Sequence, residues 1–228
     1  MKSFLKKIEY SLLVLFVALQ TQVPFVVIQQ FKEGGQGFSM GETLLVLMIY
    51  LLIIFYALRM AKKEALLTLD FRFFKWSSVG WLALSYLMTF GVSILAVIIL
   101  ILEGQLSGTT ANQAALEGLF QHMPVVLVVV GAVFSAPILE EIIFRGLIPK
   151  KLFPKHDVIG LVVGSVLFGL FHGPTNIGSF VLYAGMGGVL AFVVYKTKRL
   201  EMGILAHMLR NGLAIGHCTI QYIQLRVL

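Results

Sequence analysis

The sequence predicts an all-α protein, a polytopic transmembrane helical bundle of about seven spans. Hydrophobic residues make up 58% of the 228 residues and charged residues only 13%, whereas soluble domains carry about 25% charged residues. Seven apolar runs approach or reach the length that crosses a bilayer. Basic residues gather in alternate connections between these runs, as they do in multi-pass membrane proteins. We therefore expect a single membrane domain over residues 1–228.

The seven runs are separated by short connections, and each has the low charge of a membrane helix. They cover residues 10–29, 43–60, 79–102, 123–148, 157–173, 177–195 and 202–224. The first run follows a basic start, and no small-residue cleavage site comes after it, so we expect a retained helix. Trp76 and Trp81 mark the start of the third run as interfacial anchors.

Polar and small residues characterise the later runs. The polar stretch 104–118 separates the third run from the fourth and predicts a flexible loop. In the fifth run Gly160 and Gly164 lie four residues apart, and the sixth contains four glycines between residues 178 and 188. Small residues let membrane helices approach closely, so these glycines predict tight packing.

The basic residues set an orientation. They cluster before the first run and in the connections after the second, fourth and sixth runs, at residues 2–7, 59–75, 150–155 and 196–199. The other connections contain only Lys32 between them. The positive-inside rule then predicts a cytoplasmic N-terminus, and it explains the net charge of +7 without a nucleic-acid partner. We expect a bacterial plasma membrane, because no organellar targeting signal is evident and the loops are short.

Ionisable residues inside the predicted spans call for an explanation, since each costs about 2.5–3.5 kcal/mol near the bilayer centre on insertion scales. They fall in the fourth, fifth and seventh runs and comprise Glu140, Glu141, Arg145, His172, His207 and Arg210, with the polar Asn211 beside them. Hydrolytic sites commonly use a carboxylate together with imidazoles to activate water. Three runs therefore converge on one hypothesis, a hydrolytic site inside the membrane.

Helical spacing assigns partners within each run, because residues four apart share one face. Glu141 can pair with Arg145 as a structural ion pair, Phe168 stacks beside His172, and His207 stands one turn from Asn211. Glu140 is left without an intrahelical partner, which makes it the candidate for chemistry. His122, His156 and His217 lie at helix edges or away from these faces, and we expect no role for them. The single cysteine, Cys218, excludes a disulfide framework.

Three motifs resemble those of one family. EEIIFRG at 140–146 fits EExxxR, FGLFH at 168–172 fits FxxxH, and HMLRN at 207–211 fits HxxxN. In this order, over a core at about 123–215, the sequence resembles the CAAX protease and bacteriocin-processing membrane proteins (CPBP, Abi). Arg210 is not part of the pattern.

This resemblance implies an intramembrane glutamate-type endopeptidase acting on a peptide or a membrane protein. Glu140 matches the base and His172 its helper, while His207 and Asn211 match positions that stabilise the oxyanion. Glu141, Arg145 and Phe168 then support the motifs. No cofactor is predicted, and the compact HExxH signature is absent. A divalent metal such as zinc is the alternative, with Glu140, His172 and His207 as its ligands.

Two other functions remain open on the sequence alone. A non-proteolytic bacteriocin-immunity or partner-binding protein would keep the polar cluster as a scaffold, and a small transporter would use it as an ion relay.

One difficulty concerns the depths at which the three candidate site residues would lie in the membrane. At 1.5 Å per residue, Glu140 and His172 lie about 20 and about 29 Å from the turn near 153–154, whereas His207 lies about 9 Å past the turn near 201. Tilt, an interfacial segment at 147–156 or a short fifth helix would reconcile these heights.

Overall fold

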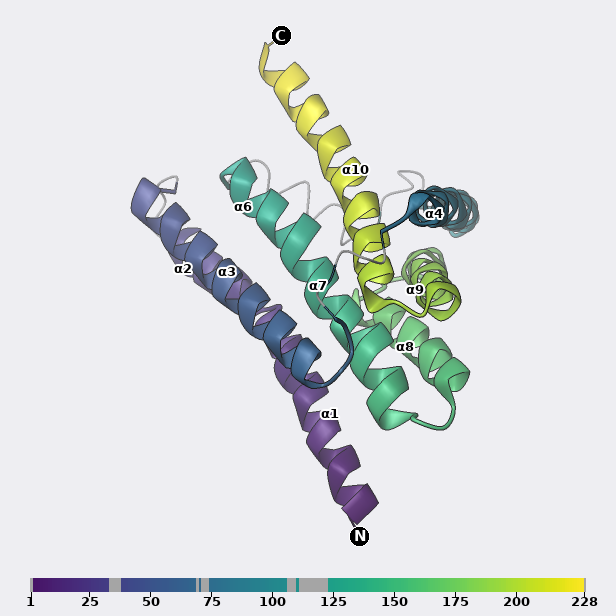
Figure 1. The fold of residues 1–228 in the computed structure, drawn as a ribbon. Helices are drawn as coiled ribbons and strands as arrows, with labels where there is room; N and C mark the ends of the chain where they lie inside the picture. The colour runs from purple at the N-terminus through teal and green to yellow at the C-terminus, as the bar shows by residue number, and fades with distance from the viewer. Residues whose placement is uncertain are drawn as a thin grey trace.

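The computed structural model describes residues 2–32, 38–68, 70, 74–105, 110 and 123–227, and its regular structure there is helical throughout. This confirms the all-α prediction. The helices in chain order (Figure 1) are α1 (Lys2–Gln20), α2 (Val23–Lys32), α3 (Met40–Lys63), α4 (Trp76–Leu102), α6 (Val125–Val129), η2 (Val130–Ser135), α7 (Ala136–Glu141), η3 (Ile142–Leu152), α8 (Asp157–Phe171), α9 (Ile177–Thr197) and α10 (Leu200–Val227).

Four helices of the described chain are long and apolar enough to cross a membrane: α3, α4, the continuous helix Val125–Leu152 and α9. The other predicted runs coincide with α1 and α2, with α8 and with α10. Each of the seven runs therefore falls on helix. The chain is a multi-pass membrane protein.

The prediction of one helix over residues 10–29 is wrong, because the helix breaks at Thr21–Gln22. Pro24 lacks an N–H and its ring would clash with the carbonyl four residues earlier, so an uninterrupted helix is disfavoured there. The Thr21 hydroxyl donates to the Ala18 carbonyl at 2.7 Å. The result is α1 followed by the shorter α2.

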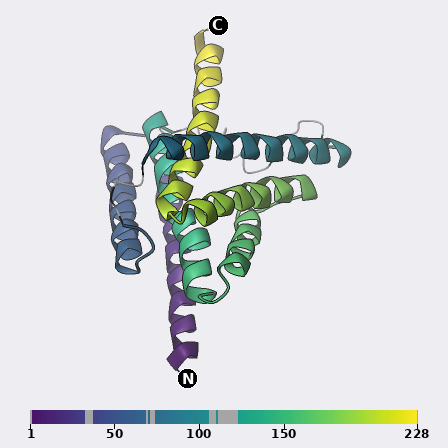
Figure 2. The same ribbon diagram turned by 45° about the vertical axis from the view of Figure 1, so that its right-hand side comes forward.

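The continuous helix Val125–Leu152 lies centrally in the molecule, between α1, α2 and α3 on one side and α8, α9 and α10 on the other (Figure 1). Figure 2 shows α4 and α9 running crosswise to α1, α3 and α10. Glu103, just after α4, accepts hydrogen bonds from the N–H groups of Ile177 and Gly178, both at 2.9 Å. This carboxylate joins the end of α4 to the start of α9.

Two prolines explain the irregular winding of the central helix. Pro137 and Pro149 each lack the N–H that an α-helical turn needs, and η2 and η3 are π-helical segments at these places. The N–H of Ala136 donates to the Gly131 carbonyl, five residues back. Such π segments occur frequently at functional sites. Here they flank α7, the short segment that contains Glu140.

Glycines permit close contact between α8 and its neighbours, as predicted. A Cβ at Gly164 would collide with the Phe144 carbonyl oxygen of η3, and a Cβ at Gly187 would lie 3.0 Å from the Ser165 carbonyl oxygen. Gly188, in contrast, would meet nothing within 4 Å. Close packing therefore uses specific glycines, not the cluster as a whole.

Helix α8 resolves the depth difficulty. Its 15 residues rise about 22 Å at 1.5 Å per residue, less than the roughly 30 Å of a bilayer core. The Phe168 ring lies 5.4 Å from the Phe144 ring and 5.6 Å from the His207 ring. The end of α8 therefore lies beside the central helix and α10, and its length agrees with a short fifth helix, one of the three expected solutions.

Candidate active site

Glu140 and Glu141 lie at the junction of α7 and η3, between apolar residues of the central helix. Neighbouring Leu139 and Ile142 are buried, so both carboxylates are enclosed. Glu140 is 7% exposed and Glu141 fully buried. Burying ionised groups is costly unless they are paired, so the partners of these two residues decide what they can do.

Glu141 forms a buried ion pair with Arg145. The Arg145 guanidinium donates from Nη1 to Glu141 Oε1 at 2.9 Å, and both side chains are fully buried. This is the ion pair predicted from i,i+4 spacing. Arg145 Nη2 donates to the Gly187 carbonyl of α9 at 2.8 Å, and its guanidinium carbon lies 4.4 Å from the centre of the Phe168 ring. The pair therefore links the central helix to α9 and α8.

His207, which is 2% exposed, lies between the two carboxylates. Its Nδ1 lies 3.1 Å from Glu141 Oε1. A carboxylate oxygen only accepts, so Nδ1 carries the proton. The other ring nitrogen, Nε2, lies 4.0 Å from Glu140 Oε2. Glu141 thus turns His207 toward Glu140.

Glu140 differs from its neighbour in having no ion pair with Arg145. In the described part of the molecule its Oε2 is buried and has no hydrogen-bond partner; Glu141 Oε2 has none either, but Glu141 is already paired through its Oε1. Buried polar atoms are nearly always hydrogen-bonded, so an unpartnered one calls for an explanation such as a catalytic role or a water. Glu140 therefore offers a free carboxylate oxygen beside an imidazole nitrogen.

His172 is the first residue after α8. Its Nδ1 lies 2.8 Å from the Phe168 carbonyl oxygen, which only accepts, so Nδ1 is protonated and a neutral ring carries its lone pair on Nε2. The ring stacks on Tyr183 at 4.3 Å between centroids and 12° between planes. Within the described part of the molecule, His172 makes no hydrogen bond or ion pair with Glu140 or Glu141. Phe168, which contacts both histidine rings, connects it to the site.

Phe168 is the centre of this packing. Its ring lies 4.5 Å from the His172 ring and 5.6 Å from the His207 ring, while Arg145 covers it. The expected stacking of Phe168 beside His172 is present. One buried aromatic side chain therefore sets the separation of the two histidines.

Asn211 is tied to the central helix. Its Nδ2 donates to the Ala132 carbonyl of η2 at 2.8 Å, which leaves one amide N–H for another acceptor. Arg210 next to it is half-buried. His156 and His217 are exposed, and His122 lies outside the described residues.

A metal site requires at least three donors grouped together. Among the described residues, no three His, Cys, Asp or Glu side chains form such a group. Glu140 and His207 are neighbours, whereas the ring contacts of His172 are with aromatic side chains. Glu140, His172 and His207 are therefore not grouped as three metal ligands among the described residues, and no step below depends on an ion.

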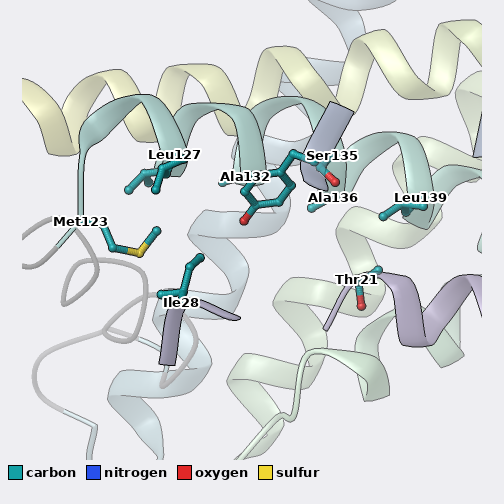
Figure 3. A pocket seen from close by; sticks show the side chains of 11 residues that line it. Thr21, Ile28, Met123, Leu127, Ala132, Ser135, Ala136 and Leu139 are labelled. Atoms are coloured by element: carbon teal, nitrogen blue, oxygen red, sulfur yellow. The ribbon is translucent and has the colours of Figure 1, made fainter. Parts of the chain in front are cut away.

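A cavity of about 190 Å³ runs along the same helix on another face. Figure 3 shows Leu127, Ala132, Ser135 and Leu139 on its one side and Ile28 on the other. None of the four motif residues Glu140, Glu141, His172 and His207 lines it. It is therefore separate from the polar cluster, although Leu139 adjoins Glu140 in the chain.

Comparison with known proteins bears on this cluster. The family model described as Type II CAAX prenyl endopeptidase Rce1-like matches residues 122–213. The matched segment includes all three motifs, with Glu140, Glu141, Arg145, His172, His207 and Asn211.

Parts of the chain are similar in sequence to bacterial proteins. The chain is 36% identical over 106 residues to "Putative membrane peptidase YdiL" of Bacillus subtilis, and this alignment covers 46% of the chain and 41% of YdiL. It is 36% identical over 87 residues to "Membrane-embedded CAAX protease MroQ" of Staphylococcus aureus, covering 35% and 34%. It is 28% identical over 182 residues to "UPF0177 protein YvdC" of Lactococcus lactis, covering 78% and 68%.

The match thus spans less than half the length of YdiL and of MroQ. No solved structure matches the chain. The match to the Rce1-like family model, together with the similarity to these bacterial proteins, supports a membrane protease.

Proposed function

We propose that the protein is an intramembrane endopeptidase that hydrolyses peptide bonds with a water activated by Glu140 and His172. The observation that carries this proposal is the free, buried oxygen of Glu140, which faces Nε2 of His207. Its neighbour Glu141 has its charge matched by Arg145. Glu140 is therefore the carboxylate left to act as a base.

The reaction balances with these residues alone. A water bound at Glu140 gives a proton to the carboxylate while its oxygen attacks the peptide carbonyl carbon. The carbon–nitrogen bond then breaks, and Glu140 returns the proton to the leaving amine. His172 assists because its Nε2 lone pair can accept a hydrogen bond from the same water.

The tetrahedral intermediate carries a negative oxygen that needs fixed donors. Asn211 has one amide N–H beyond the one that it gives to Ala132. His207 donates from Nε2 when that nitrogen is also protonated. Donors held in place in a site of low dielectric constant stabilise such a charge strongly, and Glu141 and Asn211's bond to η2 supply that fixation.

The substrate class follows from the location and the relatives. We infer a peptide or membrane-protein substrate that reaches the site from the lipid bilayer, in a bacterial plasma membrane with a cytoplasmic N-terminus. Because MroQ is named a CAAX protease, a prenylated CAAX peptide belongs among the substrates to be tested.

The test uses the full chain purified in detergent. Fluorogenic peptides, with and without a prenylated C-terminal cysteine, are incubated with wild type, Glu140→Gln and His172→Ala, each with and without a chelator. We expect wild-type cleavage that both substitutions abolish and that the chelator leaves intact. Loss of wild-type cleavage with chelator, restored by zinc, would replace the metal-free mechanism by a metal-dependent one. Absence of wild-type cleavage on all peptides, with an immunity phenotype that survives Glu140→Gln, would favour the partner-binding function.

A further inference from the structure

Helix α9 contains none of the three motifs, yet it contacts His172 directly and is linked to His207 through Arg145 and Glu141. Two of its groups, one turn apart, are responsible: the Gly187 carbonyl accepts from Arg145, which pairs with Glu141 beside His207, and Tyr183 stacks on His172. We propose that Tyr183 is a positioning residue for His172, a role that rests on the proposed peptidase function.

His172 needs such a partner because of its place in the chain. It ends α8, and the next residue, Gly173, already has a φ of +59°. The side chain is only half-buried. A ring at a helix end has fewer neighbours than one in mid-helix, so its orientation depends on the few contacts that remain.

Beside the edge-on ring of Phe171 at 6.2 Å, three closer contacts fix the ring. The Phe168 carbonyl holds Nδ1 at 2.8 Å, the Phe168 ring lies 4.5 Å away at 45°, and Tyr183 lies parallel at 4.3 Å and 12°. The first two come from α8 itself and move with it. Tyr183 is the contact that relates the imidazole to a second helix.

Tyr183 is itself well placed for this role. The side chain is 7% exposed, and its hydroxyl lies 3.0 Å from the Thr110 hydroxyl. Helices α8 and α9 come very close beside it, since a Cβ at Gly169 would lie 2.8 Å from the Ala184 Cβ and 3.0 Å from the Ala184 N. The backbone approach therefore fixes the distance between the two rings.

Loss of the Tyr183 ring would let the imidazole turn and move Nε2 away from the attacking water. Small misplacements of reacting groups cost up to about 100-fold in rate. Substrate binding does not depend on this ring orientation, so the effect belongs in kcat and not in KM.

The kinetic test compares Tyr183→Leu and Tyr183→Met, which lack the ring, with Tyr183→Phe, which keeps it. Tyr195→Leu is the control, because Tyr195 is an exposed tyrosine on the same helix. We expect kcat to fall about tenfold or more in the first two variants, within the range that misplacement explains, with little change in KM. Tyr183→Phe and Tyr195→Leu should stay close to wild type. Equal kcat in Tyr183→Met and wild type would overturn the proposal.

A second measurement needs no peptidase activity and separates this inference from the function on which it rests. Diethyl pyrocarbonate modifies accessible imidazoles, and mass spectrometry follows the adduct at each histidine in a Glu140→Gln background. We expect faster modification of His172 in Tyr183→Leu and Tyr183→Met but not in Tyr183→Phe, while the exposed His156 and His217 serve as internal references. Unchanged modification of His172 in all three variants would refute a positioning role, whatever the peptide assays show.

Discussion

Glu140 and Glu141 are adjacent in the chain, and their surroundings give them different tasks. Glu141 accepts from Arg145 and from His207 through Oε1, so its charge is compensated. Glu140 has no such direct ion pair with Arg145: its Oε2 is unpartnered among the described residues and lies 4.0 Å from Nε2 of His207. A turn of about 100° around the helix separates a structural carboxylate from the one available for chemistry.

Replacing Glu140 with glutamine tests this difference. Glu140→Gln keeps the shape and removes the base, so we expect cleavage to fall about 100-fold to 10,000-fold, the usual contribution of a general base. Thermal unfolding should change little, because the lost oxygen has no partner. The matched control is Glu64→Gln, which removes a partly exposed ion pair with Lys151 and should leave activity intact. A comparable loss in both variants would remove Glu140 from the mechanism.

Breaking the buried ion pair should affect folding. Arg145→Leu leaves the fully buried Glu141 without its cation, which we expect to cost about 3–5 kcal/mol of unfolding free energy. The double substitution Glu141→Leu/Arg145→Leu removes both charges and should recover part of that loss. Denaturant unfolding in detergent measures both. A double variant no more stable than Arg145→Leu would show that the pair is not coupled.

Sequence reasoning at this scale succeeded for contacts within a helix and missed those between helices. Glu141 with Arg145 and Phe168 with His172 follow from i,i+4 spacing. The carbonyl acceptors at Gly187 and Ala132 could not be predicted, because every residue has a backbone carbonyl and residue type does not indicate which one accepts a hydrogen bond. Tyr183 was missed for a related reason: an aromatic residue in an apolar helix gives no sign of which ring it will face.

At the scale of elements, the contact between α8 and η3 depends on glycine. Gly164→Ala would place a methyl group against the Phe144 carbonyl oxygen, and overpacking of this kind costs about 1–3 kcal/mol. The matched control is Gly188→Ala, where the added Cβ meets nothing within 4 Å. We expect a lower unfolding temperature and weaker cleavage for the first variant only, measured by thermal melts and the peptide assay. Equal melts for the two would mean that α8 can move away at no cost.

The positions of the helices were predictable and their irregularities less so. Each apolar run fell on helix, because a run of that length has few other ways to satisfy its backbone in lipid. Pro24, Pro137 and Pro149 signalled where winding would change, but not whether the result would be a break or a π segment. The early end of α8 had a local signal in Gly173–Pro174, since glycine and proline commonly follow a helix end.

At the scale of the whole molecule, two of the four basic segments, residues 2–7 and 150–155, lie toward one end. In Figure 1 the N-terminus and the turn between η3 and α8 lie at the lower end, and the C-terminus lies at the upper end. The basic turn residues Lys150 and Lys151 pair with Asp157 and Glu64. This arrangement agrees with the expectation that the N-terminus and the turn after η3 lie on the same side of the membrane.

Cysteine labelling tests the orientation. In a Cys218→Ser background, which removes the single cysteine, Lys155→Cys and Gln105→Cys place thiols at two exposed positions. With the N-terminus in the cytoplasm, an impermeant maleimide on intact cells should label position 105 and not 155, and permeabilised cells should label both. The reverse pattern would invert the topology.

The crosswise course of α4 and α9 (Figure 2) was beyond sequence reasoning. Hydrophobic length states that a helix can span a bilayer, but its tilt is set by packing against neighbours. Gly187 and Gly169, where an added Cβ would meet a neighbouring helix, look the same in sequence as Gly188, where an added Cβ would meet nothing within 4 Å. The depths of Glu140, His172 and His207 therefore could not be brought together from residue counts.

The short α8 has a further consequence, for water. A helix end leaves about four carbonyl groups without intrahelical partners, and hydrocarbon cannot satisfy them. At the end of α8 the Phe168 carbonyl is satisfied by His172, and the Leu170 carbonyl accepts from the Gly173 N–H at 3.0 Å. The remaining carbonyls of this last turn need solvent or protein partners, and they lie next to His172. On the proposed peptidase function, this polar helix end is where we expect water, the second substrate of the reaction, to collect.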